Sequence, residues 1–121
     1  MIRIRGDGLF ASGKVSVEDA YAPILERIAE ALDQLPGRIL ITGHTDSVPI
    51  RTRRFASNQQ LSEERAESVK KVLAASIGEP RRISTRGRGA AELLLPEAPK
   101  DARNRRVEIT LWRSSNPVGT P

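Results

Sequence analysis

The 121-residue sequence contains no cysteine and a single histidine, His44. The absence of cysteine excludes a disulfide framework, a thiolate metal site and a cysteine nucleophile. One histidine is too few for a multi-histidine metal centre. Aromatic residues make up only 3% of the chain, which argues against nucleic-acid binding through base stacking. We therefore expect a protein that holds no metal ion and no cofactor.

Long apolar runs are also absent. No stretch approaches the roughly 20 apolar residues that a membrane-spanning helix needs, and no signal peptide opens the chain. With 38% hydrophobic and 29% charged residues, the composition is that of a single globular domain with one modest core. We predict a domain over residues 1–113, followed by a flexible tail over 114–121.

Positive charge is concentrated in the later part of the chain. Residues 1–35 contain 4 basic and 6 acidic residues, whereas residues 36–121 contain 16 basic and 9 acidic residues, and the net charge is +5. Arginine outnumbers lysine 16 to 4, and its planar guanidinium pairs well with carboxylates and phosphates. This pattern fits either an anionic partner or a plain solvated basic surface.

Apolar patterns predict strands over residues 2–5, 38–42, 82–85 and 104–112 and helices over residues 17–35 and 59–77. Because helical crossovers join parallel strands, we expect strands joined in this way to be neighbours. The order predicts an α+β fold of the βαβαββ type. We expect a two-layer sandwich, in which a mixed sheet of about four strands carries the helices on one face.

Capping and breaking residues suggest where the helices begin and end. Ser16 is the expected N-cap of the first helix, and Pro23 marks either a kink or the start of the regular part. Asn58 is the expected cap of the second helix, and Gly78 is its expected C-terminal stop.

Arg65 interrupts the apolar face of the second predicted helix, four residues after Leu61 and four before Val69. A buried guanidinium needs an anionic partner, because it cannot lose its charge. Asp46 is the obvious candidate, since it lies just past the carboxyl end of a predicted central strand, where open sheets tend to hold ligands. The two could form a structural ion pair, or Arg65 could extend to solvent. Alternatively, both line a cleft and grip the two ends of a zwitterionic ligand.

Catalytic motifs are weak in this sequence. His44 and Asp46 with a nearby serine lack the nucleophile elbow and the third orienting group of a hydrolase triad. We expect His44 to pack or to hydrogen-bond a neighbouring backbone group. The Gly87-Arg88-Gly89 segment lacks the third glycine and the opening helix of a dinucleotide-binding loop. The protein is therefore not expected to be an enzyme.

Four sequence blocks occur in a fixed order: Gly43-His44-Thr45-Asp46, the segment from Asn58 to Val69, Gly87-Arg88-Gly89, and Asn104-Arg105-Arg106-Val107-Glu108-Ile109. Together they resemble the OmpA-like peptidoglycan-binding domain, over about residues 4–111. The opening run Arg5–Phe10 and the phrase Ser47-Val48-Pro49-Ile50, with the longer loop after it, are most similar to the flagellar-stator and type VI secretion branch of that family.

The resemblance implies non-covalent binding of peptidoglycan through the diaminopimelate of its stem peptide. It implies that Asp46 receives the ammonium of the ligand, that Arg65 binds a carboxylate and that Asn58 helps to hold the peptide. The same cleft is expected to include Thr45, Leu61 and Arg105. Two departures from the common pattern are a basic loop between Asp46 and Arg65, which could cover the cleft, and arginine in the segment 86–89, where an aromatic residue is frequent.

The resemblance also implies a cellular setting. The chain would be the periplasmic, soluble domain of an inner-membrane-anchored protein whose membrane segment precedes Met1. Its partners would be other subunits of an envelope complex, such as a type VI secretion system, and dimerisation within that complex is compatible with the family. No nucleic-acid partner is expected on this interpretation.

Two alternatives stay open at this point. A nucleic-acid-binding module is favoured by the arginine content and by the cluster Arg51, Arg53 and Arg54, and is opposed by the few aromatics and the acidic first third. A structural protein-interaction module with a vestigial cleft is the other alternative, in which Trp112 and the tail would mark the partner surface.

Overall fold

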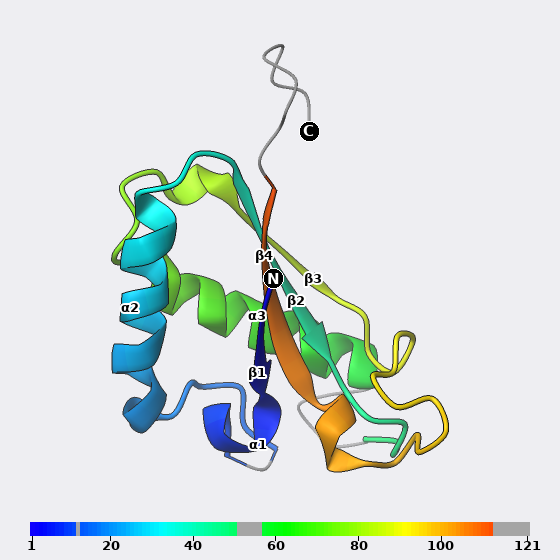
Figure 1. Cartoon of the computed structure of the whole chain (residues 1–121). Helices are drawn as coiled ribbons and strands as arrows, with labels where there is room; N and C mark the ends of the chain where they lie inside the picture. Colours follow the sequence, from blue (N-terminus) through cyan, green and yellow to red (C-terminus); the bar gives the residue numbers. More distant parts are fainter. Residues whose placement is uncertain (12, 51–56, 113–121) are drawn as a thin grey trace.

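The computed structural model describes residues 1–11, 13–50 and 57–112 (Figure 1). Four strands form one sheet in the order β1-β4-β2-β3. The strands are β1 (Ile2–Arg5), β2 (Arg38–His44), β3 (Ile83–Gly87) and β4 (Arg106–Trp112). β2 pairs with β3 in parallel, and β4 pairs antiparallel with both β1 and β2. The predicted α+β class, βαβαββ order and mixed four-stranded sheet are confirmed.

The expectation that crossovers join neighbouring strands holds for β2 and β3 only. It is wrong for β1 and β2, because β4 lies between them. β4, the last strand in the described residues, therefore occupies an inner position in the sheet.

Two long helices, α2 (Ala22–Asp33) and α3 (Asn58–Ala74), pack against one face of the sheet. Inward-facing side chains alternate along the strands, because successive residues of a strand point to opposite faces. They meet the apolar stripes of both helices in one buried cluster that includes Leu25, Leu32, Ile39, Ile41, Val69, Leu73, Val107 and Ile109. None of the helices in the described ranges is long and apolar enough to cross a membrane.

The first helical region differs from the prediction. Instead of one helix capped by Ser16, the chain forms a one-turn helix α1 (Gly6–Leu9), a short 3₁₀ turn η1 (Asp19–Tyr21), and then α2. Pro23 lies in the first turn of α2, where a residue without an N–H loses no helical hydrogen bond. Val17 forms an isolated bridge with Phe10 instead of a helical turn.

The second helix begins one residue earlier than expected, and its cap is Ser57. The Ser57 hydroxyl accepts a hydrogen bond from the Gln60 N–H at 3.2 Å. Asn58 is therefore the first residue of α3, and its side chain is available for other contacts. The helix ends at Ala74, before the predicted Ile77, and Gly78 lies in a bend after it.

Two glycines let the beginning of α3 lie directly on the sheet. A Cβ atom added at Gly43 of β2 would overlap the carbonyl oxygen of Ser62, and one added at Gly87 of β3 would lie 2.5 Å from the amide nitrogen of Glu63. This close approach brings the first two turns of α3, with Leu61 and Arg65, to the carboxyl end of β2.

The short elements 3₁₀ turn η3 (Ala102–Asn104) and α1 lie at the same end of the sheet (Figure 1). A third 3₁₀ turn, η2 (Pro80–Arg82), precedes β3.

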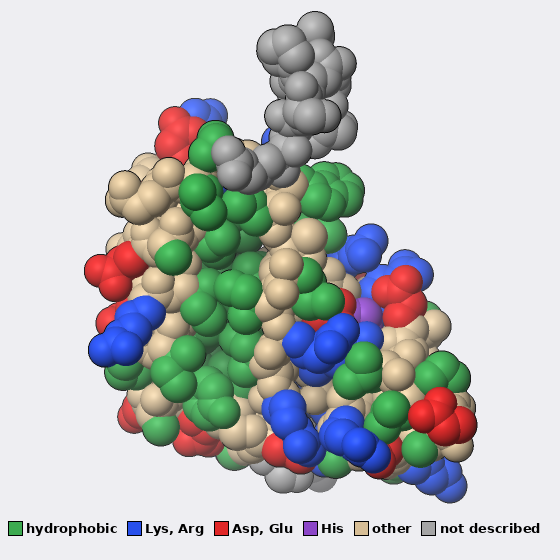
Figure 2. Space-filling view, in the orientation of Figure 1, with side chains coloured by type: hydrophobic (Ala, Val, Ile, Leu, Met, Phe, Trp, Pro, Cys, Tyr) green, Lys and Arg blue, Asp and Glu red, His purple; other side chains and the backbone are tan. Residues whose placement is uncertain are grey.

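On the side of the sheet opposite α2, Figure 2 shows basic side chains interspersed with acidic ones. Ion pairs there include Arg3 with Glu108 at 3.2 Å and Arg88 with Glu92 at 3.2 Å.

Candidate functional site

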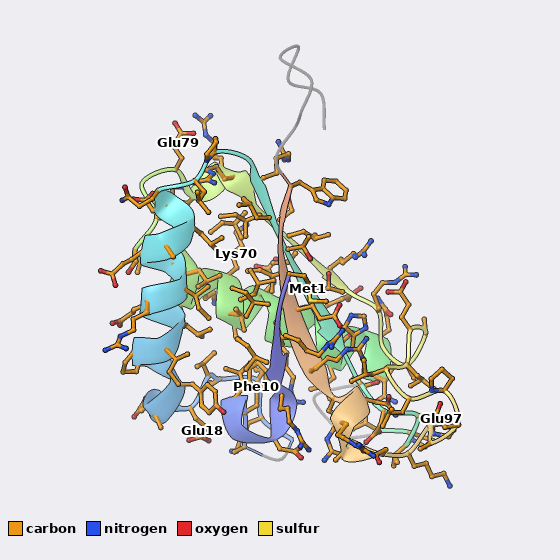
Figure 3. The ribbon with its side chains drawn as sticks, in the orientation of Figure 1. Met1, Phe10, Glu18, Lys70, Glu79 and Glu97 are labelled. Atoms are coloured by element: carbon orange, nitrogen blue, oxygen red, sulfur yellow. The ribbon has the colours of Figure 1, made fainter. Side chains whose placement is uncertain are left out.

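A pocket of about 460 Å³ opens where β2 ends, between α1, the start of α3 and the residue before β4. All six residues that the sequence singled out as a site line it: Thr45, Asp46, Asn58, Leu61, Arg65 and Arg105. Sequence reasoning missed the contribution of α1 and the residues after it, which add Gly6, Asp7, Phe10 and Gly13. Figure 3 shows Phe10 at this end of the molecule. Contact of these residues with a ligand stays a prediction.

Asp46 is held in the turn that follows β2, and its side chain is only 6% exposed. One carboxylate oxygen accepts a hydrogen bond from the Val48 N–H at 3.0 Å, and the other accepts one from Nη1 of Arg105 at 2.6 Å. The Asn58 amide donates to the carbonyl of Val48 at 2.9 Å, and the Thr45 hydroxyl donates to the carbonyl of Asp46 at 2.8 Å. These bonds fix the loop against α3, so that the carboxylate has a defined position.

Arg65 reaches the same pocket from α3 and is 9% exposed. Its Nε donates to the carbonyl of Lys14 at 2.9 Å, and its guanidinium carbon lies 4.7 Å from the centre of the Phe10 ring, a cation–π geometry. In the part of the chain that the structure describes, no carboxylate forms an ion pair with it. Burial lowers the pKa of Arg65, and the nearby Arg105 guanidinium lowers that pKa further, yet a guanidinium stays charged in proteins. A charged guanidinium is therefore part of the pocket lining.

The structural ion pair between Asp46 and Arg65, which the sequence allowed, is not formed. Asp46 pairs with Arg105 instead. The reason is the position of β4: His44 pairs with Arg106 in the β2–β4 register, so the residue before Arg106 lies beside the loop that follows His44.

Arg105 also pairs with a second carboxylate. Its Nε and Nη2 donate to one oxygen of Asp7 at 3.1 and 2.8 Å. The hydrogen bond to Asp7 raises the pKa of Arg105, against an opposing effect of burial, and Asp46 raises it further. The described pocket lining therefore contains two carboxylates and two guanidiniums, which balance in formal charge.

Asn104 is a supporting residue that the sequence indicated only as part of a motif. It is fully buried. Its Oδ1 accepts from the Leu95 N–H at 2.7 Å, and its Nδ2 donates to the carbonyls of Ala98 and Pro99 at 2.8 and 3.2 Å. The Pro99 carbonyl also accepts from the Ser47 N–H at 2.9 Å. Asn104 thereby joins the β3–β4 connection to the loop that carries Asp46.

Some predicted features lie elsewhere. Arg86 and Arg88, the arginines of the segment 86–89, are not part of the described pocket lining. The cluster Arg51, Arg53 and Arg54 and the tail 114–121 lie outside the described residues. The start of the basic loop does contribute, because Val48, Pro49 and Ile50 line the pocket.

His44 is buried beside this region, and its side chain is 2% exposed. It packs in the sheet, which is one of the two arrangements expected from the sequence. Among the described residues, neither of its ring nitrogens has a hydrogen-bond partner. Its Nε2 lies 3.5 Å from a carboxylate oxygen of Glu108, and Arg106 binds the other oxygen of that carboxylate at 2.7 Å. Burial lowers the pKa of His44, and Arg106 lowers it further.

The lowered pKa of His44 predicts a pH dependence of stability. The unfolded chain takes up a proton near the ordinary histidine pKa of about 6.5, whereas the folded chain does so only at lower pH. The free energy of unfolding should therefore fall as the pH drops below about 6.5, by at most about 1.4 kcal/mol per pH unit. Urea denaturation of wild type and His44→Gln between pH 5 and 7.5 measures this, and the variant should show a flatter profile. Parallel profiles would contradict the assignment.

The OmpA family sequence model matches residues 9–106 of the chain. Motility protein B of Escherichia coli (strain K12) is 32% identical over 103 residues, covering 84% of this chain and 33% of that protein. Motility protein B of Bacillus subtilis is 31% identical over 115 residues, covering 92% of this chain and 44% of that protein. The chain thus spans about a third to a half of the length of these relatives.

Solved structures of similar proteins agree with the sequence comparisons. The cell wall anchor of the T6SS from Pseudomonas aeruginosa superposes with a TM-score of 0.82 at 46% identity, covering 93% of this chain and 80% of that chain. The periplasmic domain of Helicobacter pylori MotB superposes with a TM-score of 0.83 at 27% identity, covering 96% of this chain and 77% of that chain.

Proposed function

Because this chain belongs to the OmpA family, we propose that it binds peptidoglycan non-covalently and anchors an envelope complex to the cell wall. The resemblance to the OmpA-like family, predicted from four sequence blocks, is confirmed by the comparisons. Its stator and type VI secretion branch, predicted from the opening run Arg5–Phe10 and from Ser47-Val48-Pro49-Ile50 with the loop after it, is confirmed as well. The observation that carries the proposal is the pocket, in which a buried carboxylate from the β2 loop and a buried guanidinium from α3 line one opening. The 46% identity to a type VI secretion cell wall anchor supports it.

The ligand that fits these charges is the free end of a diaminopimelate side chain, which carries an ammonium and a carboxylate on one carbon. Asp46 accepts the ammonium, and the Nη groups of Arg65 grip the carboxylate with parallel hydrogen bonds. Asn58 holds the loop and the peptide, and the remaining lining is formed by Thr45, Leu61 and Arg105. Each charge-assisted bond contributes about 1.5–3 kcal/mol.

Desolvation and ordering oppose these gains. We expect weak binding to one stem peptide and strong retention on the polymer, because many stems on one sacculus raise the effective concentration. No step of this binding requires catalysis, a metal ion or a cofactor.

The relatives support a cellular setting for this proposal. We place the domain in the periplasm, as part of an inner-membrane-anchored protein whose partners are other subunits of an envelope complex. A type VI secretion system is favoured by the 46% identical anchor, and a flagellar stator by the motility proteins. Dimerisation within such a complex is compatible with this placement.

Co-sedimentation with purified sacculi tests the proposed function. The protein is expected to pellet with diaminopimelate-type sacculi and to pellet far less with lysine-type sacculi, because a lysine side chain carries the ammonium without the neighbouring carboxylate. DNA serves as the control polymer. Equal binding to DNA and to both sacculi, with a steep loss on adding salt, would favour the nucleic-acid alternative instead.

A further inference from the structure

Arg105 lies between two carboxylates, and it bonds them unequally. Two of its nitrogens, Nε and Nη2, donate to Asp7 at 3.1 and 2.8 Å, and only Nη1 donates to Asp46, at 2.6 Å. The Arg105 side chain is 36% exposed and the Asp7 side chain is 47% exposed, whereas Asp46 is nearly enclosed. Arg105 therefore has room to move at the pocket mouth, while its partner Asp46 does not.

Backbone pairing between β1 and β4 places Asp7 beside Arg105. The amide of Gly6 donates to the carbonyl of Arg105 at 2.9 Å, directly beyond the last β1–β4 pair, which is Arg5 with Arg106. Asp7 is the next residue in the one-turn helix α1. A second guanidinium, that of Arg5, lies 3.7 Å from the other oxygen of Asp7. These contacts hold Asp7 beside Arg105.

The proposed acceptor for the ligand's ammonium, Asp46, already accepts hydrogen bonds from within the protein. One oxygen of Asp46 accepts from Val48 and the other from Arg105. An incoming ammonium must therefore share the second oxygen with Arg105 or displace it. Displacement breaks one hydrogen bond of Arg105 and leaves the two bonds to Asp7 in place.

We propose that Asp7 is a positioning residue that holds Arg105 away from Asp46 when a ligand binds, and thereby makes the pocket selective for a zwitterion. This inference rests on the proposed function of the same pocket. Arg105 acts as a stand-in cation on Asp46 until the ligand's ammonium replaces it, and Asp7 then keeps Arg105 neutralised. Without Asp7, Arg105 has only Asp46 as a carboxylate partner in the described pocket lining, and it competes with the ligand.

The formal charges of the pocket lining also favour a zwitterionic ligand. With Asp7 the described pocket lining is formally neutral, and a zwitterionic head group leaves it neutral. Without Asp7 the lining carries one net positive charge, which favours a plain carboxylate over a zwitterion. The loss of Asp7 should therefore change which ligand is preferred as well as how tightly it binds.

The test uses four proteins: wild type, Asp7→Asn, Arg105→Gln and the double variant. Each is titrated with a soluble muropeptide that ends in diaminopimelate and with pimelate, which carries carboxylates and no ammonium. Asp19→Asn is the matched control, because it removes the same charge from an exposed residue outside the pocket. Thermal unfolding confirms that each variant is folded.

Asp7→Asn is expected to bind the muropeptide at least about tenfold more weakly than wild type and to shift its preference towards pimelate. Removing Arg105 as well should restore muropeptide binding to within about threefold of Arg105→Gln alone, since the competitor is gone. A structure of the complex should show Arg105 bonded to Asp7 and no longer to Asp46.

Wild-type affinity in folded Asp7→Asn, or additive losses in the double variant, would overturn the role of Asp7. Either result would leave the proposed function intact if Asp46→Asn still loses binding. If wild type itself fails to bind the muropeptide, both the proposed function and this inference fail.

Discussion

Arg65→Leu is expected to abolish co-sedimentation with diaminopimelate-type sacculi while the fold is kept. Removing one partner of a desolvated charge pair costs about 2 kcal/mol or more, which is at least about 30-fold in affinity per stem. The fold should survive, because Arg65 lies on the apolar stripe of α3 next to Phe10, and no carboxylate among the described residues pairs with it, so leucine leaves no unpaired buried counter-charge there.

Two further variants test the separate roles of the charge and of the planar guanidinium. Arg65→Lys keeps the charge and loses the planar fork, so its affinity should lie between wild type and Arg65→Leu. Asp46→Asn removes the opposite charge and keeps an oxygen that can accept from Val48, so the loop should stay in place. Muropeptide titrations by calorimetry or NMR measure all three. Folded Arg65→Leu and Asp46→Asn proteins that still pellet like wild type would refute the assignment of the pocket.

Gly43→Ala is expected to lower the free energy of unfolding by about 3 kcal/mol, the upper part of the usual range for overpacking. Its Cβ would overlap the backbone carbonyl of Ser62, and neither the strand nor the helix can turn away as a flexible side chain can. α3 would have to shift from β2, and Arg65 would move with it. Muropeptide affinity should therefore fall together with stability.

Gly78→Ala is the matched control for this substitution. Its Cβ would have one neighbour, Oδ1 of Asp33 at 3.6 Å, which is an ordinary contact. There we expect a change of at most about 1 kcal/mol, with stabilisation the favoured sign. Urea denaturation midpoints compare the two variants. Equal midpoints for Gly43→Ala and Gly78→Ala would show that the close approach of α3 to β2 is not required.

Local patterns predicted the elements well, because apolar periodicity reports which face of a helix or strand is buried. The same periodicity placed Arg65 on the buried face of α3, and the structure agrees. Caps were less predictable. Ser57 and Asn58 are both good capping residues, and sequence alone does not decide which of two neighbours takes the extended backbone that a cap needs.

The ionic partners in the site could not be derived from sequence, since they depend on strand order. Asp46 was expected beside Arg65, and it pairs with Arg105, which is 59 residues away in the chain. That contact exists because β4 inserts between β1 and β2 in a particular register. Asp7, 98 residues from Arg105, was missed for the same reason.

The inner position of β4 also has a consequence for how the chain folds. β1 has β4 as its strand neighbour, so pairing Ile2 with Ile109 closes a loop of more than 100 residues. Loop closure of this length is slow compared with local helix formation, and it must wait until β4 has left the ribosome. Asp7 and Asp46 are synthesised early, yet Arg105 joins them only when β4 docks. The charge arrangement of the pocket therefore requires β4 to be docked, and chains truncated before β4 lack it.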